Sequence, residues 1–181
     1  MKAAAPDLSR YQQTVRVLEG IWRHRQAHPT TQSDEIYYRL LWQYHQRLLE
    51  AKEQGKLIAG YGVMIPNEIL LAMYILPLHL ELGSNLMVSV LKQHEEAFAI
   101  AKSLGLPSEM CSAHRTLLAV HSQRWVPPPD LVVWSGTVCS SCAHSGKLVR
   151  ELWDLPGYFI DRPYLDSPTQ IAYFVQELQG L

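Results

Sequence analysis

The sequence predicts an α/β fold: a parallel, doubly wound (Rossmann-like) sheet with a helical N-terminal lead. Short apolar runs bounded by glycine or proline alternate with amphipathic segments, which is typical of strands that alternate with helices. Two longer amphipathic segments precede the first of these runs. A chain of 181 residues can bury one sizeable core. We therefore expect a helical lead over residues 1–54 and an α/β domain over residues 55–181, together forming one compact unit.

The lead is expected to be two helices. Apolar and aromatic residues recur every three or four positions from Leu8 to about His28, and again from Thr31 to about Gln54. The intervening "HPTT" separates the two segments.

Beyond Gly55 the predicted order is strand, helix, strand, helix. "KLIAGYG" is a short apolar run between glycines, "PNEILLAMY" carries Pro66 at a helix start, and "LPLHLEL" alternates as a strand does. Ser84 is a suitable N-cap for a helix that continues to about Leu104.

The last part of the chain continues the alternation. "CSAHRTLLAVHSQRW" predicts a helix with Cys111 at its entry, followed by the strand "LVVWS", the helix "SCAHSGKLVRELWD" and the strand "GYFID". Ser167 and Pro168 predict the start of a final helix. In such sheets ligands bind beyond the carboxyl ends of the strands.

Charge and apolar patterning exclude several classes of protein. Sixteen basic and seventeen acidic side chains nearly balance, so we expect no nucleic-acid partner. The first residues lack the apolar core of a signal peptide and the chain has no uncharged apolar run of membrane-spanning length, so we expect a cytoplasmic protein without a membrane partner. The sequence also lacks a P-loop, a dinucleotide-binding glycine motif and a nucleophile elbow.

Three cysteines lie in the second half of the chain, and two of them form a C-x2-C pair. An odd number in a cytosolic setting argues against a disulfide framework. Four interpretations remain open: an iron–sulfur cluster on Cys111, Cys139 and Cys142, a zinc site on these thiols and His114, a redox dithiol of Cys139 and Cys142, or packing alone.

Few other residues are candidates for acid–base chemistry. His114, His121 and His144 have side chains that titrate near neutral pH, and Glu68 lies in the first turn of a predicted helix. We retain Glu68 and His114 as catalytic candidates.

Several of these segments, taken in order, resemble the 2-hydroxyacyl-CoA dehydratase and benzoyl-CoA reductase family. "LGLPSEMCSAHR" and "PPDLVVWSGTVCSSC" look like the family's two cluster-cysteine loops, and "YFIDRPY" with "IAYFVQELQGL" is similar to its strand, turn and closing helix. The resemblance runs from about residue 35 to the end. It also covers the positions Gly60, Tyr61, Pro66, Glu68, Ala72 and Pro77.

The resemblance implies an iron–sulfur subunit, or the first half of one. It implies a [4Fe-4S] cluster held by the thiolates of Cys111 and Cys139, an electron supplied by an ATP-hydrolysing activator protein, and a CoA thioester as substrate. The enzyme would be a 2-hydroxyacyl-CoA dehydratase-like lyase or a CoA-thioester reductase, working as a heteromer with a second subunit.

Three features depart from the family pattern. The usual subunit is about twice as long and draws its third cluster cysteine from a second domain, so either Cys142 or a second polypeptide completes the site. Tyr74 stands where a glycine is expected, and Ser140 where the family often has an acidic residue. The alternative from a different class is a non-enzymatic module, stabilised by zinc or acting as a scaffold, that uses the C-x2-H and C-x2-C residues.

Overall fold

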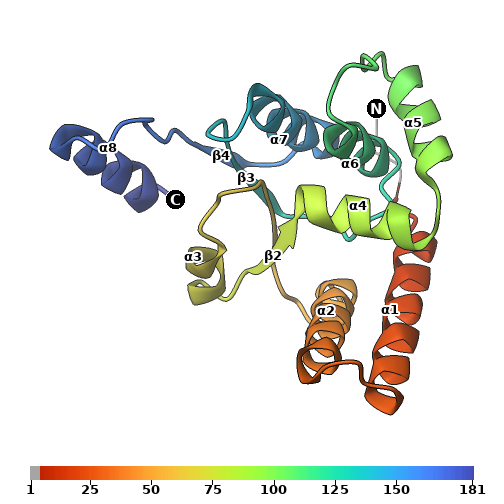
Figure 1. The fold of residues 1–181 in the computed structure, drawn as a ribbon. Helices are drawn as coiled ribbons and strands as arrows, with labels where there is room; N and C mark the ends of the chain where they lie inside the picture. The colour runs from red at the N-terminus through yellow and green to blue at the C-terminus, as the bar shows by residue number, and fades with distance from the viewer. Residues whose placement is uncertain (1–4) are drawn as a thin grey trace.

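The structure, a computed structural model, describes residues 5–181. Over this range eight helices and four strands follow one another along the chain (Figure 1). Their bounds are α1 (Ser9–Ala27), α2 (Gln32–Glu50), β1 (Ile58–Tyr61), α3 (Asn67–Ala72), β2 (Leu76–His79), α4 (Leu80–Val90), α5 (His94–Ser103), α6 (Ser112–Ser122), β3 (Leu131–Ser135), α7 (Ser140–Trp153), β4 (Gly157–Ile160) and α8 (Pro168–Gln179).

The four strands form one parallel sheet in the order β2-β1-β3-β4. At the carboxyl end of β1, Tyr61 pairs with His79 of β2 on one side and with Val133 of β3 on the other. The chain leaves β1 toward one edge of the sheet and β3 toward the opposite edge, so the switch point lies between these two strands. The predicted α/β, Rossmann-like fold is therefore confirmed.

Each face of the sheet packs against its own set of helices because side chains alternate along the strands. Ile58 and Val132 point into the larger core, which contains residues of α1, α2, α4, α5, α6 and α7. Ala59 and Val133 point into a smaller core, where α3 contributes Leu70 and α8 packs its partly buried apolar residues. In Figure 1, α8 lies at the opposite end of the molecule from the α1–α2 hairpin.

The segment after β2 differs from the prediction. "LPLHLEL" is a strand only as far as His79, and α4 begins at Leu80 with the His79 side chain accepting a hydrogen bond from the Leu82 N–H at 3.2 Å. The single helix predicted from Ser84 to about Leu104 was wrong, because the chain turns between α4 and α5 at Lys92, whose φ is 56°. Ser84 is a buried residue of α4 and not its cap.

The two predicted lead helices are present and pack on each other. Trp22 of α1 stacks on Trp42 of α2 with ring centroids 4.7 Å apart. Tyr44 fastens α2 to the edge strand β2, since its hydroxyl donates to the Pro77 carbonyl at 2.7 Å and accepts from the His79 N–H at 3.2 Å. Among the described helices, none is both long enough and apolar enough to cross a membrane.

Candidate metal centre

Two helix starts meet at the carboxyl end of the sheet and bring three metal-ligating side chains together. The loop after β3 leads to Cys139, the N-cap residue of α7, and Cys142 follows in the first turn of that helix. His114 lies in the first turn of α6, which packs beside α7. A turn closes each helix start, because the Cys142 N–H donates to the Cys139 carbonyl and the His114 N–H to the Cys111 carbonyl, both at 3.1 Å.

The ligand atoms of His114, Cys139 and Cys142 lie within 4.8 Å of one another. The two sulfurs are 3.4 Å apart, and His114 Nε2 lies 3.6 Å from Cys142 Sγ and 4.0 Å from Cys139 Sγ. Soft thiolates with an imidazole suit zinc and similar ions. The three residues can therefore bind a metal ion.

Burial shifts the pKa values of two of these three groups. Burial, together with the neighbouring Cys139 thiol, raises the pKa of Cys142 to about 12. The pKa of His114 is lowered because its ring is partly desolvated, an effect that the negative charge of Glu81 opposes. Cys139 is exposed at the N-terminus of α7. Cys139 is thus the accessible thiol of the pair and Cys142 the protected one.

A partly buried carboxylate, Glu81, lies beside this group and was not predicted as a functional residue. A Cβ built on Gly62, just after β1, would lie 3.8 Å from Glu81 Oε1, which places the carboxylate at the switch point of the sheet. Asn85 ties this region to α6, because its amide donates to the Glu81 carbonyl at 2.7 Å and to the Ala113 carbonyl at 3.1 Å. If the strand had been predicted to end at His79, Glu81 would have been identified as a residue just beyond the carboxyl end of a strand.

Two buried polar atoms in this region lack hydrogen-bond partners among the described residues: Glu81 Oε2 and His114 Nδ1. His79 Nδ1 lies 3.2 Å from Glu81 Oε2, but this nitrogen already accepts the Leu82 N–H. Unpaired buried polar atoms are costly and typically mark functional sites or missing ligands. Their position next to the three ligand atoms supports a site that is built to bind.

The other predicted residues lie at different distances from this group. Cys111 is the exposed N-cap residue of α6, and its thiol is not among the three ligand atoms that converge. Glu68 is exposed on α3 and lines a pocket. His121 is buried and accepts a hydrogen bond from Trp153 Nε1 at 3.0 Å. His144 is exposed on α7.

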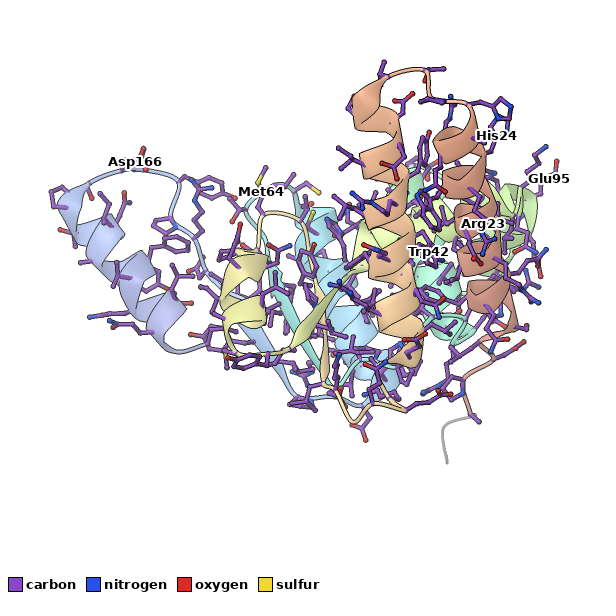
Figure 2. The ribbon with its side chains drawn as sticks, turned by 90° about the horizontal axis from the view of Figure 1, so that it is seen from below. Arg23, His24, Trp42, Met64, Glu95 and Asp166 are labelled. Atoms are coloured by element: carbon purple, nitrogen blue, oxygen red, sulfur yellow. The ribbon has the colours of Figure 1, made fainter. Side chains whose placement is uncertain are left out.

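A pocket of about 690 Å³ opens between the β1–α3 loop and α8. Figure 2 shows Met64 and Asp166 on the loops at its two sides. Its lining is largely apolar, with charged groups at Glu68, Asp166 and Arg162. The lining also includes Tyr61, Ile65, His79, Ile171 and Phe174.

Side-chain contacts lead from this pocket toward the metal-ligating group. Tyr61 and His79, which both line the pocket, pack with ring centroids 4.8 Å apart. His79 Nδ1 is next to the Glu81 carboxylate, and the charge of Glu81 acts on His114. The pocket and the three ligand atoms thus share one edge of the sheet.

Residues 62–181 match the family described as 2-hydroxyglutaryl-CoA dehydratase, D-component. No curated protein sequence matches the chain. The matched segment contains all three cysteines, His114 and Glu81, and its length exceeds half of the chain. The chain therefore belongs to the 2-hydroxyglutaryl-CoA dehydratase D-component family.

Proposed function

We propose that this chain is a metal-dependent component of a 2-hydroxyacyl-CoA dehydratase-type lyase, or of a related CoA-thioester reductase, and acts in the cytoplasm with a second subunit. One observation carries the proposal. Within the segment that matches the family, two thiols and an imidazole converge at the carboxyl edge of the parallel sheet, where such folds bind their ligands.

Family resemblance implies that a [4Fe-4S] cluster, when bound, would pass one electron from an ATP-hydrolysing activator protein to the CoA thioester. Cys111 and Cys139 suit such a role, because both thiols are exposed at the starts of neighbouring helices. Cys142 lies only 3.4 Å from Cys139. Because each iron of a cluster takes its own thiolate, the body of the cluster separates those sulfurs. In this arrangement Cys142 is too close to Cys139 to be the third cluster ligand, so a cluster on Cys111 and Cys139 would take that ligand from the second subunit.

The pocket provides a place for the acyl group of a thioester. Its apolar side chains, including Ile65 and Phe174, would bury the acyl carbons, and excluding water there strengthens polar contacts at the reacting centre. Arg162 can pair with a phosphate or carboxylate of the thioester. Glu68 offers a carboxylate that can accept a proton from the substrate.

Binding of 2-hydroxyglutaryl-CoA, measured by titration calorimetry on the chain purified without oxygen, tests this function. We expect Arg162→Ala to weaken binding about tenfold or more, because hydrogen bonds to charged groups contribute about 1.5 to 3 kcal/mol. We expect Glu68→Gln to leave binding unchanged and to lower turnover in the complex with the second subunit.

The control is Lys102→Ala on α5, which removes a positive charge outside the pocket. Equal affinity of the Arg162 variant and the parent chain, or no binding of the thioester, would contradict the proposal.

The second candidate is a zinc-stabilised module without enzymatic activity. The close approach of His114 to the C-x2-C pair favours it. A chain that binds zinc, takes up no thioester and unfolds when zinc is removed would support this candidate over the dehydratase component.

A further inference from the structure

The spacing of the three ligand atoms distinguishes one metal ion from a cluster. With zinc–sulfur bonds of about 2.3 Å and zinc–nitrogen bonds of about 2.05 Å, tetrahedral geometry places two sulfurs about 3.8 Å apart and a sulfur and a nitrogen about 3.6 Å apart. The observed separations are 3.4 Å for the sulfurs and 3.6 and 4.0 Å for the two sulfur–nitrogen pairs. Three atoms at these distances surround one point that can hold a single ion.

We propose that His114 Nε2, Cys139 Sγ and Cys142 Sγ hold one tetrahedral metal ion of the zinc class, with its fourth position open. Two thiolates and one imidazole form the donor set of zinc sites that keep a position for water or a substrate oxygen. The exposed side of the group is at Cys139, so an incoming oxygen atom would reach the ion there. The proposal rests on the proposed function for the identity of that oxygen, which would belong to the thioester, and it places a single ion at Cys139 in place of a cluster.

Glu81 completes the site from the buried side. Metal-binding histidines usually donate their second ring N–H to a carboxylate, which fixes the ring and its tautomer. His114 Nδ1 is buried without a hydrogen-bond partner in the described part of the chain, and Glu81 Oε2 has only the His79 Nδ1 contact at 3.2 Å. The Asn85 bridge holds the backbones of the two segments together. Once Nε2 binds the ion, Nδ1 carries a proton that needs an acceptor, and Glu81 is the carboxylate whose charge acts on this ring. Glu81 is therefore a positioning residue for His114.

Single-ion binding and the cluster compete for the same thiol, because Cys139 is a ligand in both. They differ in their other ligands. The single ion requires His114 and Cys142 and does not require Cys111, whereas the cluster requires Cys111 and does not require His114. Substitutions of these residues therefore separate the two arrangements.

The test is zinc uptake by the full chain, purified without oxygen and stripped with a chelator. We expect one zinc per chain, and an affinity that falls more than about 100-fold in His114→Ala, Cys139→Ser and Cys142→Ser. Glu81→Gln should lose about 10-fold to 100-fold. Cys111→Ser and His144→Ala are matched controls, one from each helix start, and should bind as the parent chain does.

Cobalt gives a second measurement that does not depend on affinity. Cobalt bound to the parent chain should show the intense visible absorption of a tetrahedral site and a thiolate-to-cobalt band. The His114 variant should lose the tetrahedral pattern while its far-ultraviolet circular dichroism stays that of the parent, which separates ligand loss from unfolding.

Three results would overturn the proposal. The first is equal iron and acid-labile sulfide in the anaerobic chain that survives His114→Ala. The second is loss of zinc in Cys111→Ser, which would mean a closed four-ligand site. The third is a Cys139–Cys142 disulfide in chain kept with reductant. Failure of the dehydratase function is separate, because it would appear as absent thioester binding in a chain that takes up zinc as expected.

Discussion

His45 and His121 are buried in the larger core and are kept neutral there. Burial lowers the pKa of His45 to about 4 and that of His121 to about 3. Each accepts or shares a hydrogen bond through Nδ1, with the Tyr11 hydroxyl at 2.7 Å and with Trp153 Nε1 at 3.0 Å respectively. Protonation of either ring would place a charge in an apolar interior, so the native state resists it.

These pKa values make the free energy of unfolding depend on pH. In the unfolded chain a histidine binds a proton below about pH 6.5, whereas the folded chain does not bind it until the pH approaches the lowered value. Stability should therefore be constant above pH 7 and fall by up to about 1.4 kcal/mol per pH unit for each histidine as the pH drops below 6. Urea unfolding monitored by tryptophan fluorescence at several pH values measures this slope.

The matched variants are His45→Gln, which should reduce the slope below pH 6, and His144→Gln, which should leave it unchanged because His144 is exposed. A parent chain with equal stability at pH 7 and pH 5 would contradict the assignment of two neutral buried histidines.

At the scale of elements, the turn between α4 and α5 has a defined helix-ending geometry. Gln93 N–H donates to the Val88 carbonyl at 2.9 Å and Lys92 N–H to the Ser89 carbonyl at 3.2 Å, which is the Schellman pattern. Lys92 occupies the left-handed position with φ of 56°, where glycine is preferred. The sequence "VLKQHEE" carries no glycine at this position, which explains why one continuous helix was predicted.

Replacing Lys92 with glycine should stabilise the chain. A left-handed conformation costs a non-glycine residue about 1 to 2 kcal/mol, and the extra backbone entropy of glycine in the unfolded chain recovers part of this, so we expect a net gain of about 0.5 to 1 kcal/mol. The measurement is the urea midpoint. Lys102→Gly in the last turn of α5 is the control and should destabilise by up to about 1 kcal/mol. A lower midpoint for Lys92→Gly would show that the Lys92 side chain contributes more than its backbone costs.

For the whole molecule, the sequence predicted the sheet better than the site. The recurrence of apolar residues along the chain identified every strand. The C-x2-H and C-x2-C spacings identified His114, Cys139 and Cys142 as ligand candidates. Spacing could not show that Cys111 lies outside the converging group, because its side-chain direction depends on how α6 packs beside α7. Glu81 was missed because the alternation in "LPLHLEL" continues past the true end of β2, and only the tertiary contacts of Leu80 in the core reveal the change to helix.

The helical lead lies outside the family match but completes the core of the family segment. The match begins at residue 62, whereas the larger core contains Tyr11 and Val15 of α1 with Leu48 of α2. The hydroxyl of Tyr44 satisfies two backbone groups of β2, which is an edge strand of the sheet. Removing the lead would expose apolar core residues and leave a strand edge unpaired, a combination that promotes aggregation.

A chain of residues 55–181 should therefore fail to fold cooperatively. Each fully buried Leu, Val or aromatic residue lost from the interface removes about 1.5 to 3 kcal/mol, and several such losses exceed the 5 to 15 kcal/mol of a typical domain's stability. Circular dichroism and thermal unfolding of the shortened chain measure this, with the full chain carrying Tyr44→Phe as the milder comparison. That variant loses only two hydrogen bonds, should unfold in one transition, and should be less stable by about 1 to 3 kcal/mol. If the shortened chain unfolds in one transition at the parent temperature, the lead is an appendage to the sheet domain and not part of its core.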